Sequence, residues 1–133
     1  MNNKILIVSA NYYEEISKNL ELGTTNTLKE NGYSYEVINA PGCFEIPYLI
    51  KKNIENYKGF ISLGCIIKGD TYHFEVIANE TSRKIMDLSI EFNVPIGFGI
   101  LTCYNLDQAI IRSDVSQKNK GQEAALACVQ LLK

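Results

Sequence analysis

The chain has 133 residues, of which 46% are hydrophobic and 21% are charged, and its net charge is −2. This length suits one domain with a moderate core, and the near-neutral charge gives no reason to expect nucleic acid or an acidic membrane surface as a partner. No stretch is apolar and long enough for a membrane span or a signal-peptide core, so we expect a cytoplasmic protein.

The first half of the chain predicts two strands and two helices. A fully apolar run at Lys4–Ser9 predicts a strand buried on both faces. Glu14–Asn31 carries apolar residues near helical spacing, and Tyr33–Asn39 alternates as a more exposed strand would. Phe44–Asn56 predicts a second helix with Pro47 in its first turn, where the missing N–H costs little.

The second half continues the alternation. Gly59–Ile67 is the most apolar run and predicts a third strand, followed by a long helix over His73–Asn93. Val94–Leu101 predicts a fourth strand, and two helices follow over Leu106–Arg112 and Gly121–Leu132. Strands that alternate with helices imply a parallel sheet with helices on both faces. We therefore expect one α/β domain over residues 1–133.

Four loops follow the predicted strands and are expected to converge at one edge of the sheet. They are Ala10–Tyr13, Ala40–Glu45, Lys68–His73 and Leu101–Asn105. In open α/β sheets, ligands bind at the carboxyl ends of the strands, where the next helix directs free N–H groups and a positive dipole end. The convergence offers aromatic faces for a planar ring, a carboxylate for hydroxyl groups and a nest for phosphate.

The third of these loops is the most informative segment. Gly69, Asp70 and Thr71 follow the most apolar strand, and His73, the only histidine, comes two residues later at the start of a helix. A glycine, a carboxylate, a hydroxyl and an imidazole thus stand where an anionic substrate is best bound.

Taken singly, each candidate residue also has a structural explanation. Tyrosines and histidines are common on surfaces. A carboxylate or hydroxyl at a helix start can cap the helix or complement its dipole. A basic side chain can simply belong to a solvated surface of the protein. The residues concerned are Tyr12, Tyr13, Glu45, Asp70, Thr71, His73, Arg112, Lys118 and Lys120.

The four cysteines are scattered and form no C-x-x-C pair. Three of them lie in apolar contexts, which predicts reduced thiols that serve as small hydrophobic residues. One histidine and no clustered cysteines make a poor zinc set, so no metal is expected. The cysteines are Cys43, Cys65, Cys103 and Cys128.

The order of the motifs resembles the lumazine synthase family over nearly the whole chain. Pro41–Pro47 (PGCFEIP) is similar to the family's P-G-x-F-E-I-P, and Leu63–Glu80 is similar to its L-G-x-x-I-x-G-x-T-x-H-x-x-x-V-x-N-E. Phe98-Gly99, Gln108–Arg112 and Asn119–Gly121 fall in the same order as in that family.

This resemblance implies a three-layer, flavodoxin-like subunit with a four-stranded parallel sheet. Members assemble into pentamers with active sites between adjacent subunits, and some build a shell from twelve pentamers. The implied reaction condenses 5-amino-6-(D-ribitylamino)uracil with 3,4-dihydroxy-2-butanone 4-phosphate. It yields 6,7-dimethyl-8-ribityllumazine, phosphate and water in riboflavin biosynthesis, and needs no cofactor or metal.

The resemblance also implies roles for the phosphate-handling residues. His73 would move protons during imine formation, phosphate elimination and ring closure, because the pKa of imidazole lies near neutrality. Backbone N–H groups around Gly69, Asp70 and Thr71 would bind the phosphate. Arg112 would add a bidentate charged contact from the adjacent subunit.

Further residues would contact the organic part of the substrates. Glu45 would accept hydrogen bonds from ribityl hydroxyls, and Phe98 of the neighbouring subunit would cover the pyrimidine. Lys120 would also reach the adjacent site. The remaining implied substrate contacts are Tyr12, Phe44, Cys65, Ile66 and Ile67.

Some positions depart from the family pattern. Tyr12-Tyr13 stands where members usually have Phe or Trp followed by Asn, and Ile77 takes the position of the family's valine. Ser113–Lys120 lacks the glycines common in shell-forming members, and little chain precedes the first strand. These two features favour a free pentamer over a shell.

Two alternative functions remain open at this point. An archaeal-type riboflavin synthase resembles this family in fold, but it needs no phosphate site, so residues 69–71 and Arg112 argue against it. A catalytically silent flavin-binding or shell protein on the same scaffold would lack the histidine or the phosphate contacts, and both are present in this chain.

Overall fold

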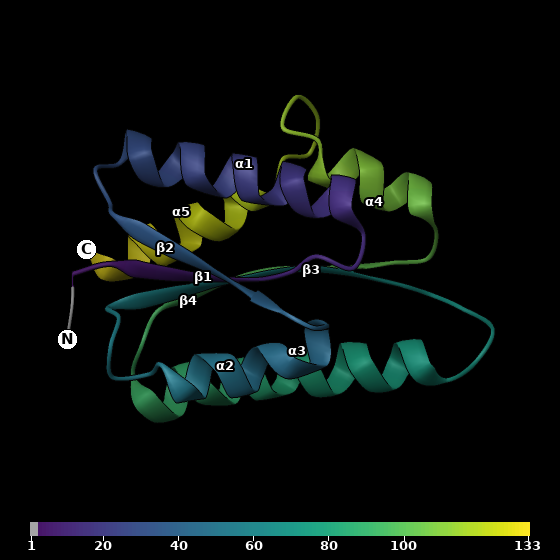
Figure 1. Cartoon of the computed structure of the whole chain (residues 1–133), viewed down its shortest axis with the longest axis horizontal. Coiled ribbons are helices and arrows are strands. Elements are labelled where there is room, and N and C mark those ends of the chain that lie inside the picture. Colours follow the sequence, from purple (N-terminus) through teal and green to yellow (C-terminus); the bar gives the residue numbers. More distant parts are fainter. Residues whose placement is uncertain (1–2) are drawn as a thin grey trace.

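A four-stranded parallel sheet forms the middle layer of the protein, with the strand order β2-β1-β3-β4. The computed structural model describes residues 3–133. The sheet and its covering helices are shown in Figure 1. The strands are β1 (Ile5–Ala10), β2 (Tyr35–Ala40), β3 (Gly59–Ile67) and β4 (Ile96–Cys103).

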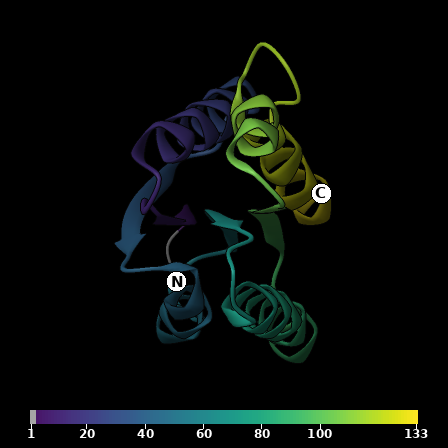
Figure 2. The same cartoon turned by 90° about the vertical axis from the view of Figure 1, so that its right-hand side faces the viewer.

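Helices cover both faces of this sheet, which confirms the predicted three-layer α/β class (Figures 1 and 2). One face carries α1 (Glu14–Glu30), α4 (Leu106–Ser113) and α5 (Lys120–Leu132), and the other carries α2 (Ile46–Lys52) and α3 (His73–Phe92). Of the helices in residues 3–133, none combines the length and the apolar character needed to cross a membrane.

Burial on both faces explains why β1 is apolar except at Ser9, whose hydroxyl donates to Glu21 at 2.7 Å. Ile5 and Ile7 belong to the core cluster beneath α1 and α5, while Leu6 and Val8 belong to the cluster beneath α2 and α3. All four side chains are 0% exposed. Successive side chains of a strand point to opposite faces, so a central strand between two helical layers needs apolar residues at nearly every position. Strand β2 lies at the edge and is more exposed, as its sequence predicts.

The predicted elements are confirmed in type and order, with differences at their ends. The predicted helix 44–56 is wrong in extent: a 3₁₀ turn (Cys43–Glu45) comes first, and α2 ends at Lys52. Pro47 lies in the first turn of α2, as predicted. At the other end, the side chain of Asn53 donates to the Leu49 carbonyl at 2.8 Å. This bond occupies a last-turn acceptor and helps to end the helix there.

Two glycines let α5 approach its neighbours closely. A Cβ on Gly97 of β4 would overlap the carbonyl oxygen of Ala124 in α5, and a Cβ on Gly121 would overlap the carbonyl oxygen of Leu20 in α1. The hydroxyl of Thr24 in α1 also donates to the Gly121 carbonyl at 3.1 Å. The helical layer above β4 therefore depends on the absence of side chains at these two positions.

We expect Gly97→Ala to lower the free energy of unfolding by about 1–3 kcal/mol, because the new methyl group must displace the backbone of α5. Denaturant unfolding of the purified protein measures this change. Gly69→Ala is the matched control, since a Cβ at Gly69 meets no atom within 4 Å. Equal stability of the Gly97→Ala variant and the unmodified protein would show that α5 does not constrain β4.

Candidate active site

A cavity of about 300 Å³ opens at the carboxyl edge of the sheet. The loops after β1, β2 and β3 meet there, as predicted for three of the four loops, together with the first turns of α3. The fourth loop starts with Leu101 and Thr102, which line a different cavity. The lining residues of the first cavity are Tyr12, Tyr13, Gly42, Cys43, Cys65, Ile66, Ile67, His73 and Ile77.

Two buried thiols contribute to the apolar floor of this cavity. Cys43 and Cys65 are each 8% exposed, and Cys65 also contacts the thiol of Cys103 on β4. Burial raises the pKa of Cys43 to about 11 and that of Cys65 to about 12. Both therefore remain neutral thiols at physiological pH and act as small apolar groups. All four cysteines of the chain are free and buried, as predicted.

Two tyrosine rings form one wall. Tyr12 and Tyr13 meet edge to face with their ring centroids 4.9 Å apart. Tyr12 is 77% exposed, whereas Tyr13 is partly buried. The pKa of the Tyr13 hydroxyl is raised, mainly by this burial and to a smaller extent by the nearby Cys65. An exposed ring held by a second ring offers a face on which a planar heterocycle can stack.

His73 lies at the mouth of the cavity as the first residue of α3. Its backbone N–H donates to the hydroxyl of Thr71 at 3.4 Å, and the N-cap residue Tyr72 makes no side-chain cap. Gly69 and Asp70 are exposed just before this helix start. The bond to Thr71 occupies the His73 N–H, and a helix N-terminus leaves further backbone N–H groups of its first turn available to an anion. Residues 69–71 and the imidazole thus lie next to each other, as the sequence predicts.

The segment after β2 supplies a carboxylate at the rim. Gly42 lines the cavity, and the Glu45 carboxylate lies beside it. If Gly42 carried a Cβ, that atom would lie 3.1 Å from Oε1 of Glu45. The ring of Phe44 points elsewhere: it is 54% exposed and lines a cavity of about 180 Å³ between α2 and α3, with Pro47 and Thr81. Glu45 therefore lies beside a residue that lines the cavity without lining it itself, whereas the Phe44 side chain faces a different cavity.

The other three candidates lie together on a different surface. Phe98, Arg112 and Lys120 line a cavity of about 490 Å³ formed by β4, α4 and α5, and it shares no lining residue with the first cavity. Arg112 donates to the Gln108 carbonyl at 3.3 Å, and within residues 3–133 it has no carboxylate partner. Lys120 pairs with Glu123 at 3.0 Å. This second cavity therefore presents a guanidinium and an aromatic ring.

Sequence reasoning did not assign Gly42, Cys43 or Ile77 to the cavity. Gly42 and Cys43 stand in the loop after β2, so their place after a parallel strand was the available signal. Ile77 is four residues after His73 on one helix, and this spacing places both on the same face. In the part of the chain that the structure describes, no three His, Cys, Asp or Glu side chains are grouped so that they could hold a metal ion.

Comparison with known proteins gives one consistent result. The family model described as 6,7-dimethyl-8-ribityllumazine synthase matches residues 2–133. A 6,7-dimethyl-8-ribityllumazine synthase of Novosphingobium aromaticivorans is 46% identical over 131 residues, which cover 97% of this chain and 94% of the relative. A relative of the same name from Bartonella bacilliformis is 43% identical, covering 100% of this chain and 92% of the relative. A third relative of this name, from Bartonella tribocorum, is 44% identical, covering 97% of this chain and 89% of the relative.

The buried thiols predict a loss of stability at alkaline pH. Because the pKa of Cys43 rises from 9.0 to about 11 on folding, the native state holds this proton more tightly than the unfolded state. The contribution of this protonated thiol to the free energy of unfolding is complete below pH 9.0 and is lost as the pH rises toward about 11. Denaturant unfolding across this range should show a shallower pH dependence for Cys43→Ala than for the unmodified protein. Parallel curves for the two proteins would contradict the burial of this thiol.

Proposed function

Because the chain belongs to the 6,7-dimethyl-8-ribityllumazine synthase family, we propose that it condenses 5-amino-6-(D-ribitylamino)uracil with 3,4-dihydroxy-2-butanone 4-phosphate. The products are 6,7-dimethyl-8-ribityllumazine, phosphate and water, in riboflavin biosynthesis. The single observation that carries the proposal beyond the family match is the position of His73. It lines a cavity that is walled by tyrosine rings, and it is the first residue of the helix that follows residues 69–71.

The residues around this cavity match the chemical demands of the reaction. Imine formation, phosphate elimination and ring closure all move protons, and His73 is the titratable imidazole at the cavity. The N–H groups around residues 69–71 bind the phosphate. Tyr12 stacks on the pyrimidine, and Glu45 accepts hydrogen bonds from the ribityl hydroxyls. Cys65, Ile66 and Ile67 contact the pyrimidine from the end of β3.

The separation of the two cavities supports an active site between adjacent subunits. Arg112, Phe98 and Lys120 do not reach the His73 cavity within one chain, since they line a different surface. In the proposed assembly this surface meets the His73 cavity of the next subunit. Arg112 then binds the phosphate there, Phe98 covers the pyrimidine, and Lys120 reaches the same site. Two different patches that meet head to tail form a ring when the rotation between neighbours closes, and the proposed ring is a homo-pentamer.

An exposed apolar face on the β4 side also supports assembly. Met86 and Ile90 of α3, Phe98 of β4 and Leu131 of α5 are 45–76% exposed. They line one cavity of about 510 Å³. The edge strand β4 lies between α3 on one face of the sheet and α5 on the other (Figure 2). An open strand edge beside apolar side chains favours pairing with another chain. Covering this face with a neighbouring subunit removes that exposure.

The proposed location is the cytoplasm, because four free, buried thiols suit a reducing compartment.

Light scattering tests the size of the assembly. We expect a particle of about 75 kDa, five times the chain mass of 15.0 kDa, because residues 113–120 lack the glycines of shell-forming members. A megadalton particle would exclude the free pentamer, and a 15.0 kDa particle would exclude the shared site.

Turnover of the two substrates, followed by lumazine absorbance, tests the function itself. We expect His73→Ala to slow turnover by about 10–100-fold without abolishing it, since proton transfer is impaired while the two substrates remain positioned. Arg112→Ala should raise the KM for the phosphate substrate by about 10–100-fold, because a charge-assisted bond is lost. A full-rate Arg112→Ala enzyme would refute the phosphate contact, and riboflavin formed from supplied lumazine would favour the riboflavin synthase alternative.

The same two variants reveal whether the site is shared. In a ring assembled from both variants, a junction is intact when the subunit that retains His73 meets one that retains Arg112. With random mixing this holds for about a quarter of the junctions of a head-to-tail ring. Co-expression should therefore restore activity that neither variant has alone. Activity no higher than the average of the two variants would place the whole site within one chain.

A further inference from the structure

The loop between β3 and α3 is tied together at its two ends by one ion pair. Lys68 follows the last residue of β3, and Glu75 is the third residue of α3. The Nζ atom of Lys68 donates to Oε2 of Glu75 at 2.8 Å. The pair therefore spans the segment that carries Gly69, Asp70, Thr71 and His73, and it restricts the separation of the two elements on which that segment is anchored.

Lys68 is itself fixed to the neighbouring strand. Its backbone N–H donates to the Cys103 carbonyl, the last residue of β4, at 2.9 Å. Its ammonium lies 5.8 Å from the ring centroid of Phe74, and that ring lies 6.3 Å from the ring of Tyr104. The lysine side chain is thus directed toward the start of α3 by a backbone bond on one side and by an aromatic ring on the other.

Glu75 is the better-buried partner of the pair. Its side chain is 29% exposed, and its Oε1 atom is buried without a hydrogen-bond partner within residues 3–133. The hydrogen bond from Lys68 lowers the pKa of the Glu75 carboxyl, so the carboxylate is charged at neutral pH. A carboxylate in the first turn of a helix is also stabilised by the helix dipole. Within residues 3–133, Lys68 is therefore the partner that this carboxylate has from outside the helix.

The spanned segment has little else to hold it. Apart from the 3.4 Å contact from the His73 N–H to Thr71, no hydrogen bond to residues 69–71 is found in the described part of the chain. A Cβ at Gly69 would meet no atom within 4 Å, so the segment lies open to solvent. Its conformation therefore depends on the elements at its two ends.

We propose that the Lys68–Glu75 pair is a clamp that positions residues 69–71 for the phosphate of the substrate. This inference rests on the proposed function and deepens it. Holding the segment in its binding conformation beforehand reduces the entropy lost when phosphate binds. Lys68 and Glu75 are then positioning residues, because they act through the backbone N–H groups of the segment and do not touch the phosphate.

A competing explanation is that the Lys68 ammonium attracts phosphate directly. The two explanations differ in what they predict for Glu75. If Lys68 acts directly, Glu75→Gln frees the cation and tightens phosphate binding, whereas if the pair is a clamp, Glu75→Gln weakens it. The variants Lys68→Met, Glu75→Gln and the double variant therefore separate them, and Lys68→Arg keeps the pair as a conservative rescue.

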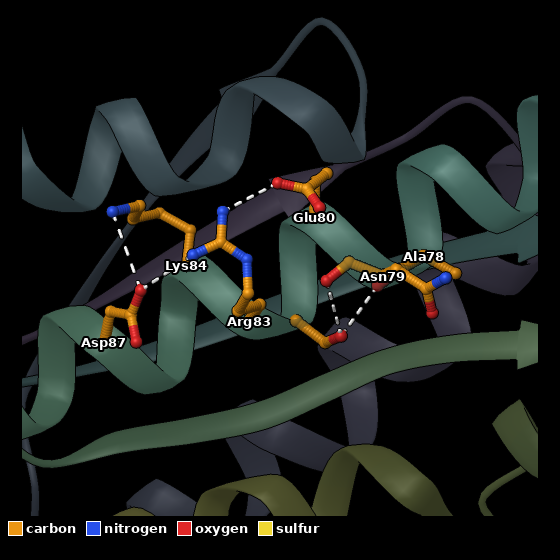
Figure 3. A network of polar contacts seen from close by, with 7 residues as sticks. Ala78, Asn79, Glu80, Arg83, Lys84 and Asp87 are labelled. Atoms are coloured by element: carbon orange, nitrogen blue, oxygen red, sulfur yellow. Dashed lines mark hydrogen bonds and ion pairs between the residues drawn. The ribbon is translucent and has the colours of Figure 1, made fainter.

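Farther along α3, a second set of ion pairs provides the matched control. Arg83 donates to Glu80 at 2.7 Å and to Asp87 at 3.2 Å, and Lys84 lies 3.6 Å from Asp87 (Figure 3). These pairs join residues of one helix and span no loop. Asp87→Asn removes exposed ion pairs from the same helix by the same carboxylate-to-amide change as Glu75→Gln.

We expect each single clamp variant to raise the KM for 3,4-dihydroxy-2-butanone 4-phosphate by about two- to five-fold, the range of an exposed ion pair. The KM for the pyrimidine substrate should not change, the double variant should be no worse than the single variants, and Lys68→Arg and Asp87→Asn should match the unmodified enzyme. The clamp is overturned if Glu75→Gln leaves this KM unchanged or lowers it, or if Asp87→Asn raises it equally.

Hydrogen exchange separates failure of the clamp from failure of the proposed function. In the unliganded protein, the hydrogen-bonded amides at the two ends of the segment, at positions 68 and 76, should exchange faster in Lys68→Met and Glu75→Gln than in Asp87→Asn. This measurement needs no substrate, so it stands even if the unmodified protein does not turn the two substrates over. Equal exchange in the three variants would overturn the clamp whatever the catalytic result.

Discussion

Parallel pairing of β1 with both β2 and β3 is the constraint on which the remaining structure depends. It buries β1 on both faces and requires helices above and below the sheet. It also directs the carboxyl ends of the strands to one edge, where the loops that follow β1, β2 and β3 form a common cavity. The tyrosine wall, the thiol floor and His73 come from segments far apart in the chain, and this pairing brings them together.

Much of the fold could be predicted because burial leaves a direct trace in the sequence. The run 59–67 is apolar except at Ser62, and β3 has those bounds in the structure. The bounds of the second helix were harder to predict, because apolar residues continue beyond the point where the helix ends. Its length is limited by the 3₁₀ turn before Pro47 and by the Asn53 side chain, which bonds back to the last turn. Such end effects depend on single hydrogen bonds, and a hydrophobic pattern does not record them.

Some residues of the candidate site could likewise be placed from the sequence, and others could not. His73 and Tyr12 could be placed at the sheet edge because each lies in the loop that follows a predicted strand. No local pattern shows that Phe98, Arg112 and Lys120 share a cavity, because β4, α4 and α5 are brought together only by the packing of the whole layer. Nor does the sequence reveal that the Phe44 ring faces the groove between α2 and α3, since its direction follows from the 3₁₀ turn. Side-chain direction in irregular segments is where sequence reasoning is weakest.

The close contact of Gly121 with Leu20 bears on the residue next to it. Lys120 opens α5, and the backbone beside it is held against α1 by that contact and by the Thr24 hydroxyl. A long, flexible ammonium side chain therefore projects from a base that is anchored in the interior and not in a surface loop. The reach of this cation is therefore limited to the length of its four methylenes, and the ion pair with Glu123 holds its tip beside the first turn of α5.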